Sequence, residues 1–347
     1  MSLKTNSTCF SKLPLLLFSL LLFSFSTAYA LDTSSSRTLT PENIKRVLNE
    51  AHSKFKENKD GKNADYIKAL ADVNPDLFGI TIVTTDGNIY EVGDAKSEFS
   101  IQSISKVFTA AKAIQQHGAK ALQEKVGASA TGMPFNSIIA IEHQPKRAAN
   151  PFVNAGAIAS TSLIKAKDGE ERWKIIKSNM DDFAGRELEF NEVVYQSEVN
   201  DNKRNQAISK LLDAYGRMYA DPLETTTIYT KQCSVNVSAH DLAVMGATLA
   251  NHGVNPLSKK KVIDPQYPKY VLALMATAGL YDGAGDWLYD TGTPAKSGVG
   301  GGIVAVVPGK LAIGVFAPPL DSIGNSVKGQ LAATYIINEL GLNPYNQ

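Results

Sequence analysis

Ser103 and Lys106 stand three positions apart and could form a nucleophile and its base. In a helix, residues at this spacing lie on one face, so the hydroxyl and the amine can meet. A serine hydroxyl is a weak nucleophile until a base takes its proton, and a lysine can be that base once burial or another cation lowers its pKa. Ser105 is adjacent to Lys106 and would point away from it, so Ser103 is the preferred nucleophile. Two fixed residues alone are a weak motif.

Lys296-Ser297-Gly298 is a second candidate motif, and it precedes the glycines Gly300-Gly301-Gly302. Small residues here would let a substrate lie against the backbone of a strand. The lysine and the serine come before the glycines rather than after them, so the stretch does not have the order of a phosphate-binding loop. An ordinary glycine-rich turn between strands would produce a similar pattern.

The elements before these motifs follow from periodicity and turn residues. Thr40-Pro41 is a typical helix start. The expected elements of this first part are a helix continuing to about residue 55, a hairpin of residues 77–84 and 88–92 about Asp86-Gly87, and a helix over residues 103–117.

The middle of the chain is dominated by helical patterns, and strands return only at Lys296. Ser238 and Asp241 form a capping-box pattern. The later elements are helices at 154–165, 170–183, 192–215 and 238–251, a hairpin of 303–307 and 311–316, and a final helix at about 326–340. This order predicts an α+β fold, with one antiparallel sheet flanked by helices and built from both ends of the chain, plus an all-helical lobe at about residues 118–290. A cleft between the two would be the natural place for a site.

The two motifs in this order resemble the serine β-lactamase and penicillin-binding superfamily, whose fold is β-lactamase/transpeptidase-like. A closer likeness covers roughly residues 41–343. The stretches GKNADYIKAL (61–70), FSIQSISKVF (99–108), NPFVNAGAI (150–158), YQSE (195–198), YTKQCS (229–234), GLYDGAGDW (279–287) and PAKSGVGGGIVAVVPGK (294–310) resemble the glutaminase family. We therefore expect a glutaminase domain over about residues 40–343.

The resemblance implies a substrate site and a reaction. The residues that would surround L-glutamine are Tyr66, Gln102, Ser103, Asn154, Glu198, Asn205, Tyr229 and Tyr281, with the backbone of Val299 reaching the amide. The motif Lys296, Ser297 and Gly298 would support them. Ser103 would attack the side-chain amide after Lys106 takes its proton, Tyr281 or Tyr229 would supply a proton to the leaving ammonia, and water would release L-glutamate from the acyl-enzyme.

Each of these residues also has an ordinary structural interpretation. Without the resemblance, Glu198 would be expected on a solvated helix face. Asn154 and Asn205 could cap helices, and Tyr229 and Tyr281 could be core aromatics with hydrated hydroxyls. The chemistry of glutamine favours the functional interpretation, because its ammonium, carboxylate and amide need one anion, several neutral donors and a nucleophile.

Two other functions fit part of this pattern. A β-lactamase or D-Ala-D-Ala peptidase would use the same fold, and Ser234-Val235-Asn236 imitates its Ser-x-Asn element, although it lies far from Ser103 in the chain. A non-catalytic exported glutamine-binding sensor would use the recognition residues but would not need a complete Ser103–Lys106 pair. Acylation by penicillin would distinguish the first alternative from a glutaminase, and release of ammonia would distinguish the second.

The N-terminus predicts export. Lys4 and Lys12 precede an apolar run at residues 15–25, and Ala28-Tyr29-Ala30 ends it with small residues. This is the pattern of a signal peptide over residues 1–30 with cleavage near Ala30. The sequence therefore predicts a flexible leader at 31–39 and a periplasmic or secreted protein without a membrane segment after cleavage.

Composition excludes several other classes of function. The formal net charge of +1 in 347 residues argues against a nucleic-acid partner. Cys233 is the only cysteine after residue 30, and the five histidines are scattered, so neither a disulfide nor a metal site is expected. No cofactor is expected. A homo-oligomer, either a dimer or a tetramer, is expected from the resemblance.

Overall fold

The computed structural model describes residues 39–200 and 202–346, and the predicted signal peptide and most of the predicted leader lie outside this range. The first elements are α1 (Pro41–Phe55), α2 (Lys68–Ala71), β1 (Gly79–Thr84), β2 (Ile89–Gly93), β3 (Phe99–Ser100), η2 (Gln102–Ile104), α3 (Ser105–His117), α4 (Ala119–Lys125), α5 (Ile139–His143), α6 (Asn154–Leu163) and α7 (Gly169–Ala184). They continue with α8 (Glu192–Val199), α9 (Lys203–Ala214), α10 (Pro222–Cys233), β4 (Asn236–Val237), α11 (Ala239–Ala250), α12 (Pro268–Ala278), η3 (Tyr281–Gly283), α13 (Ala284–Thr291), β5 (Ala295–Gly298), β6 (Gly302–Val307), β7 (Leu311–Phe316) and α14 (Val327–Glu339).

A five-stranded antiparallel sheet is built from both ends of the chain, in the order β2-β1-β7-β6-β5. Strand β1 pairs with the late strand β7 in a register that sets Ile82 opposite Ile313. Strand β5, which carries the Lys296 motif, lies at one edge and pairs only with β6, where Lys296 is opposite Val304. The predicted α+β architecture, with an antiparallel sheet joined by the two ends of the chain, is confirmed.

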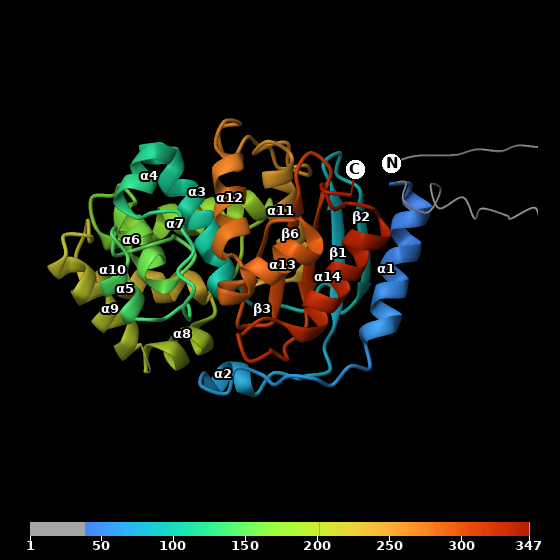
Figure 1. Ribbon diagram of the computed structural model, residues 1–347, viewed down its shortest axis with the longest axis horizontal. Helices are drawn as coiled ribbons and strands as arrows, with labels where there is room; N and C mark the ends of the chain where they lie inside the picture. The colour runs from blue at the N-terminus through green and yellow to red at the C-terminus, as the bar shows by residue number, and fades with distance from the viewer. Residues whose placement is uncertain (1–38, 201, 347) are drawn as a thin grey trace, which may run out of the picture. The chain divides into compact units, whose positions relative to one another are not determined.

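Helices cover both faces of this sheet. Helices α1 and α14 pack against each other and bury residues such as Ile44 and Ile336 in one core with the sheet residues Ile82 and Ile313. Figure 1 shows α1 and α14 beside strands β1 and β2. Helix α11 packs on the other face, against β1, β6 and β7. Gly246 permits this contact, because an added Cβ would lie 2.7 Å from a methyl carbon of Val304.

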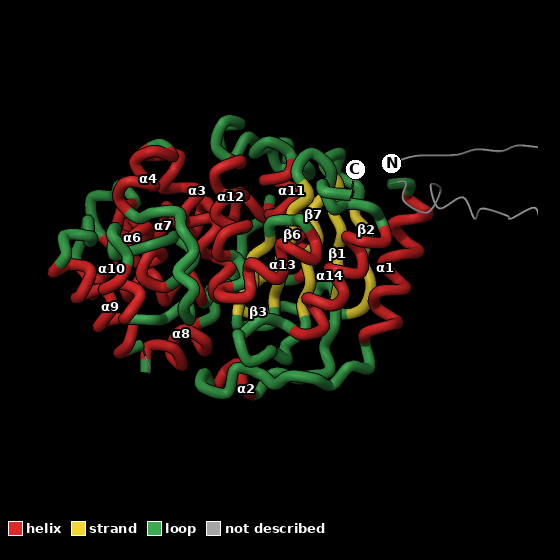
Figure 2. The backbone as a smooth tube through the Cα atoms, in the orientation of Figure 1, coloured by secondary structure: helices red, strands yellow, loops and turns green. Residues whose placement is uncertain are grey.

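A second group of helices packs around α3 and α6, with α7, α9 and α10 as their neighbours. These helices form the part of Figure 2 that contains hardly any strand. Helix α3 is buried along most of its length, from Ser105 to Ile114. The 3₁₀ turn η2, which directly precedes α3 and carries the predicted nucleophile, contacts strands β5 and β6 of the sheet. The domain boundary at about residues 118–290 stays a prediction.

Local capping explains where several helices begin. Thr40 Oγ1 accepts a hydrogen bond from the N–H of Asn43 at the start of α1, and the predicted capping box of Ser238 and Asp241 begins α11. Side-chain oxygens at this position satisfy N–H groups that have no partner inside the helix. Both of these predicted helix starts are confirmed.

Three predicted elements differ from the structure. Residues 103–117 do not form one helix, because a 3₁₀ turn at Gln102–Ile104 precedes α3, as is common at helix ends. Residues 192–215 form two helices, α8 and α9, and residues near the break include Asn200 and Asn202, a type that favours turns and caps. The two-residue strands β3 and β4 pair where no sheet was predicted, since two residues are too short to show a period.

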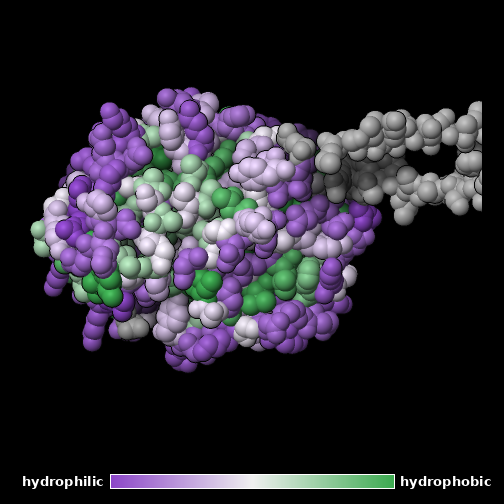
Figure 3. Space-filling model, in the orientation of Figure 1, coloured by the Kyte–Doolittle hydropathy of each residue, from purple (hydrophilic) through white to green (hydrophobic). Residues whose placement is uncertain are grey.

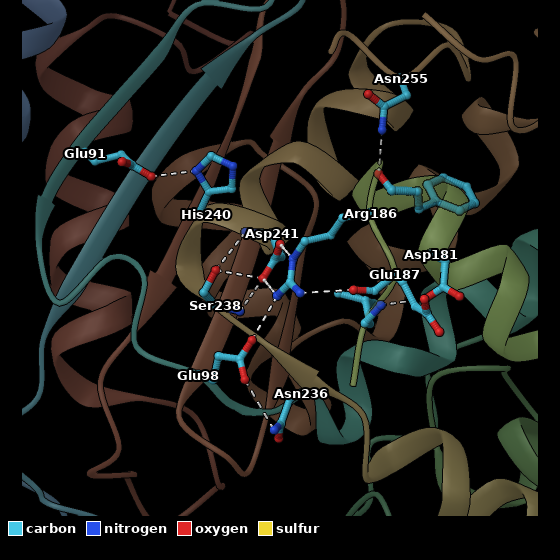
Figure 4. A network of polar contacts seen from close by, with 12 residues as sticks. Glu91, Glu98, Asp181, Arg186, Glu187, Asn236, Ser238, His240, Asp241 and Asn255 are labelled. Atoms are coloured by element: carbon cyan, nitrogen blue, oxygen red, sulfur yellow. Dashed lines mark hydrogen bonds and ion pairs between the residues drawn. The ribbon is translucent and has the colours of Figure 1, made fainter. Parts of the chain in front are cut away.

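A charged network fixes the region around β3 and β4, and Figure 4 shows it. Arg186, which follows α7, donates from Nε and Nη2 to the two carboxylate oxygens of Asp241 on α11 at 2.7 and 2.8 Å. Arg186 Nη2 also donates to Glu98 Oε1 at 3.1 Å. Glu98 directly precedes β3, so this network ties the approach to Gln102 and Ser103 to both α7 and α11.

The visible face of the molecule is mostly hydrophilic, with smaller hydrophobic areas between the polar residues (Figure 3). Within residues 39–346 as described, every helix falls short of the length and apolar character that crossing a bilayer requires.

Candidate active site

The structure brings Ser103 and Lys106 into direct contact. Lys106 Nζ donates to Ser103 Oγ at 2.6 Å and to Asn154 Oδ1 at 3.0 Å. Ser103 lies in the 3₁₀ turn and Lys106 in the first turn of α3. The Ser105 hydroxyl donates instead to the carbonyl of Gln102 at 2.7 Å. The geometry therefore places Ser103, and not Ser105, beside the lysine.

Burial makes Lys106 a usable base. The residue is 1% exposed, and this removal from water lowers its pKa to about 8, while the charges of Cys233 and Glu198 oppose the shift. A buried ammonium without an adjacent carboxylate loses hydration that its two neutral acceptors, Ser103 and Asn154, replace only in part, so the neutral amine is favoured. Near neutral pH a useful fraction of the lysine can therefore accept the serine proton.

Gln102 holds Glu198 and has a strained backbone. Its Nε2 donates to Glu198 Oε1 at 2.6 Å and to Ser100 Oγ at 3.2 Å. Its φ is 50°, which is uncommon for a residue other than glycine. Burial raises the pKa of Glu198 to about 7, opposed by the Gln102 hydrogen bond and by the charge of Lys106. The carboxylate is thus poorly solvated and suited to a cationic group.

Asn154 connects three other predicted residues. Its Oδ1 accepts from Lys106 and from the Tyr229 hydroxyl, the latter at 3.0 Å. Its Nδ2 donates to Asn205 Oδ1 at 3.0 Å. Asn154 begins α6, where Gly156 lets the chain turn closely, because an added Cβ would lie 1.8 Å from a backbone oxygen of Asn150. Four helices, α3, α6, α9 and α10, therefore meet at this amide.

Strand β5 lies close to the 3₁₀ turn that carries Ser103, and Gly298 makes this close approach possible. A Cβ on Gly298 would lie 2.8 Å from the carbonyl oxygen of Ile101, so only glycine allows the strand to come this near. The following residue, Val299, is 7% exposed. Lys296 Nζ donates to the carbonyls of Gly279 and Ser297 at 2.9 and 2.7 Å. Burial lowers the pKa of Lys296, and the neighbouring Lys106 charge lowers it further.

Tyr281 lies between β5 and the loop that contains Phe135. Its hydroxyl donates to the Ser297 carbonyl at 3.4 Å, Lys296 Nζ is 4.3 Å from its ring centroid, and its ring packs on Phe135 at 4.7 Å. Burial raises the pKa of Tyr281 to about 12, opposed by hydrogen bonding with Ser103 and Ser297. The neutral phenol therefore lies next to the nucleophile, where it can pass on a proton.

These side chains border a cavity of about 420 Å³. Its lining includes eight predicted residues, which are Tyr66, Gln102, Ser103, Asn154, Glu198, Asn205, Tyr229 and Val299. Tyr66 is 54% exposed. Lys106, Tyr281 and Lys296 do not line the cavity but contact residues that do or that adjoin it. The volume suits a small ligand.

Sequence reasoning missed several residues at this site. Phe135, Asn136, Asn202, Lys203 and Arg204 also line the cavity. Arg204 lies beside the predicted Asn205, and its Nε donates to the carbonyl of Asn136 at 2.9 Å, which no sequence pattern reveals. Helix α10, which carries Tyr229, was not delimited from the sequence. Its start at Asp221-Pro222, where Asp221 accepts from the N–H of Glu224, has a recognisable cap.

Two alternative candidates do not form sites. Burial raises the pKa of the Cys233 thiol to about 12, so the thiol stays protonated. In the Ser234-Val235-Asn236 stretch, Ser234 donates to the carbonyl of Thr230 at 3.0 Å, and Asn236 pairs with Ser100 in the small sheet. Among the described residues, none of the groups of His, Cys, Asp and Glu is arranged to hold a metal ion.

Comparisons with known proteins agree on one family. The family model described as Glutaminase matches residues 61–345. The chain is 51% identical over 305 residues to Glutaminase 2 of Yersinia pestis, covering 88% of this chain and 90% of that protein. A solved structure of a probable glutaminase, ybaS, superposes with a TM-score of 0.86 and 46% identity, over 87% of this chain and 98% of that one.

A second solved structure carries chemical information. It is the covalent complex between the Bacillus subtilis glutaminase YbgJ and 5-oxo-L-norleucine, formed by reaction with 6-diazo-5-oxo-L-norleucine. It superposes with a TM-score of 0.77 and 30% identity, over 87% of this chain and 99% of that chain. The structural neighbours are glutaminases of the β-lactamase-like fold, so the predicted fold family is confirmed.

The predicted export is wrong on these comparisons. Relatives in this family are mostly cytoplasmic, and residues 1–38, which include the predicted signal, lie outside the described residues. The apolar run at 15–25 has the composition of a signal, but composition alone does not establish cleavage or export. The periplasmic or secreted location is therefore withdrawn.

Proposed function

The chain belongs to the glutaminase family and is a hydrolase acting on the amide of glutamine, and we propose that Ser103 is its nucleophile and Lys106 the base that activates it. The observation that carries this assignment is the 2.6 Å contact between Lys106 Nζ and Ser103 Oγ at the edge of the cavity. The lowered pKa of Lys106, about 8, makes the neutral amine available for proton transfer.

The first half of the reaction forms an ester. Ser103 Oγ attacks the side-chain amide carbon of glutamine as its proton passes to Lys106 Nζ. The negative charge that develops on the amide oxygen is held by the backbone N–H groups of Ser103 and Val299. Both residues line the cavity, and Gly298 permits the close approach of their two segments.

Ammonia then leaves with an added proton. We assign its delivery to Tyr281, because burial keeps the phenol neutral and the hydroxyl interacts with Ser103. Tyr281 regains its proton from Lys106 Nζ, which had taken it from Ser103, so both residues return to their starting forms. The other predicted tyrosine, Tyr229, donates its hydroxyl to Asn154 Oδ1 at 3.0 Å and is better placed to orient Asn154. A water molecule hydrolyses the γ-glutamyl ester, which releases L-glutamate and restores the Ser103 hydroxyl.

Recognition of the amino-acid end of glutamine falls to other polar residues that line the cavity. Glu198 is the only carboxylate among the described lining residues, and its carboxylate would accept hydrogen bonds from the α-ammonium. Asn154, Asn205 and Tyr66 supply neutral polar groups for the remaining polar atoms. One anion, neutral donors and a serine match the three functional groups of glutamine.

A diazo ketone analogue of glutamine tests the nucleophile. The relative YbgJ forms a covalent complex with 6-diazo-5-oxo-L-norleucine, which supports covalent chemistry here. We expect this compound to stop ammonia release and to add one 5-oxo-norleucine group to the peptide that contains Ser103. Ser103→Ala should abolish both ammonia release and labelling, whereas the matched control Ser105→Ala should retain them. Labelling of Ser105 or Cys233 would contradict the assignment.

We also propose that the chain forms a homo-oligomer, either a dimer or a tetramer. This proposal follows from the resemblance of the chain to the glutaminase family. Sedimentation at micromolar concentration measures the mass directly. A monomer under these conditions would contradict the proposal.

A further inference from the structure

A buried asparagine joins two segments of the active site. Asn325 lies between β7 and α14 and is 1% exposed. Its Oδ1 accepts a hydrogen bond from Ser297 Oγ, and its Nδ2 donates to the carbonyl of Leu280 at 3.3 Å. A single amide thereby connects strand β5 to the residue that precedes Tyr281.

The loop around this asparagine is itself anchored. Asp321 Oδ1 accepts from the N–H groups of Ile323, Gly324 and Asn325 at 2.9, 2.9 and 3.0 Å. The N–H of Asp321 donates to the carbonyl of Asn325 at 2.9 Å. The backbone of Asn325 is therefore fixed, so its amide can hold the groups that it contacts.

The turn that carries Tyr281 needs such support. Tyr281 has a φ of 57°, in the left-handed region that bulky residues rarely adopt. Conformations of this kind persist only where surrounding contacts hold them. The carbonyl of Gly279 accepts from the N–H of Ser297 at 3.1 Å and from Lys296 Nζ at 2.9 Å. The Asn325 bond to Leu280 is the contact nearest to the strained residue in this set.

Ser297 contacts the Asn325 amide and does not line the cavity. Its hydroxyl donates to Asn325, its carbonyl accepts from the Tyr281 hydroxyl, and its side chain is fully buried. It is not among the described residues that border the cavity. The Asn325 amide therefore holds both the backbone before Tyr281 and the residue whose carbonyl receives the Tyr281 hydroxyl.

We propose that Asn325 is a positioning residue for the reaction. By bonding Ser297 and Leu280 together, it fixes the Tyr281 hydroxyl relative to Ser103. This inference rests on the proposed function, in which Tyr281 gives a proton to the departing ammonia. Asn325 touches neither the substrate nor the reacting atoms and acts only through Tyr281.

Two substrates distinguish positioning from general damage. In Asn325→Leu, which keeps a similar volume and removes both hydrogen bonds, kcat for glutamine should fall by about 10²-fold, because misplacing a catalytic group by about 1 Å has this effect. KM should change little, since the cavity-lining residues remain. The γ-thiomethyl ester of L-glutamate releases a thiolate, which leaves without prior protonation. Its kcat should therefore fall by less than about 5-fold. The substitution impairs proton donation to the leaving group, and this substrate does not need that proton.

The control variant is Gln330→Met. Gln330 Nε2 donates to Asp321 Oδ2 at 2.8 Å in the same loop, but it does not contact the Asn325 amide. This variant should hydrolyse both substrates at wild-type rates. Ser297→Ala removes the other end of the connection with a smaller change in volume, and it should show the same difference between the substrates if Asn325→Leu does not fold.

The wild-type measurement separates the possible failures. Ammonia release from glutamine and thiol release from the thioester by wild-type protein establish the reaction, and their absence would contradict the proposed function itself. With an active wild type, equal losses on both substrates, or no loss on glutamine in a folded Asn325→Leu or Ser297→Ala protein, would overturn the positioning role. A loss confined to glutamine supports it.

Discussion

Replacing Glu198 by glutamine should weaken glutamine recognition far more than it changes catalysis. In the free protein, Gln102 Nε2 donates to Glu198 Oε1 at 2.6 Å. A glutamine at position 198 can still accept this hydrogen bond through its amide oxygen. Its NH₂ group would then be presented where the carboxylate had been, so a donor would face the substrate ammonium. The existing contact is kept and the one to the substrate is lost.

The size of the loss follows from the burial of the carboxylate. Truncating one member of a desolvated charge pair typically costs about 2–5 kcal/mol. Burial raises the pKa of this carboxylate to about 7, but the residue as a whole is only half-buried, so we expect a loss in the lower part of this range, about 2–3 kcal/mol. That corresponds to a fall in kcat/KM of roughly 30- to 150-fold. The ammonium is remote from the reacting amide, so the fall should appear mainly in KM.

The assay compares two substrates and two variants. 4-Carbamoylbutanoate is glutamine without the α-amino group and never makes the contact, so Glu198→Gln should affect it much less. Glu192→Gln is the control, because Glu192 lies on the same helix and its carboxylate accepts only from the exposed Gln196 at 2.6 Å. Equal losses of kcat/KM for both substrates would refute the reasoning and return Glu198 to a structural role.

Two further variants test the base and the scaffold. Lys106→Arg keeps the charge but removes any usable neutral form of the side chain. Turnover should therefore fall at least about 10³-fold, with glutamine binding largely retained. An active variant would exclude Lys106 as the base. Arg186→Gln removes the partner of the buried Asp241 and should lower the free energy of unfolding by about 1–3 kcal/mol, measured by urea denaturation. The control His240→Gln loses only the surface pair with Glu91, so its free energy of unfolding should fall by no more than about 0.5 kcal/mol. Equal losses in Arg186→Gln and His240→Gln would contradict the role assigned to Arg186.

The sequence predicted the parts of the site that depend on local spacing. Ser103 and Lys106 could be paired from their positions alone, because a helical start and a 3₁₀ turn both bring residues three positions apart together. The two hairpins β1–β2 and β6–β7 could be predicted from clear turn residues at Asp86-Gly87 and Pro308-Gly309. Both inferences need only neighbours in the chain.

Long-range contacts could not be predicted in this way. Asn154, Asn205 and Tyr229 form one hydrogen-bonded cluster from three helices, and only the resemblance to a family gathered them in advance. The left-handed backbone of Gln102 leaves no sequence signal, because glutamine has no preference for it. Asn325 is separated from Ser297 by 28 positions and could not be singled out without the fold.

The charges of Glu198 and Lys106 act on each other and so connect recognition to catalysis. The Glu198 charge favours the protonated form of Lys106, which opposes the effect of burial. The Lys106 charge in turn lowers the pKa of Glu198, although burial raises it overall to about 7. Two groups that interact in this way titrate as a pair with shared apparent pKa values.

This coupling predicts that the wild type and Glu198→Gln respond differently to pH. The reaction needs Glu198 charged and Lys106 neutral, so the pair must lose two protons, with apparent pKa values of about 7 and about 8. Because kcat/KM reports the free enzyme, log kcat/KM of the wild type should rise with pH at a slope approaching about 2 well below pH 7 and about 1 between the two pKa values. In Glu198→Gln one titration is gone, so the slope should stay near about 1. The pKa of Lys106 obtained from the pH profile of this variant should also be lower than in the wild type. The reason is that the Glu198 anion, which favoured protonated Lys106, has been removed. An unchanged slope and midpoint across pH 5.5–9, measured as ammonia release with enzyme stability checked at each pH, would show that Glu198 neither recognises the ammonium as an anion nor acts on Lys106.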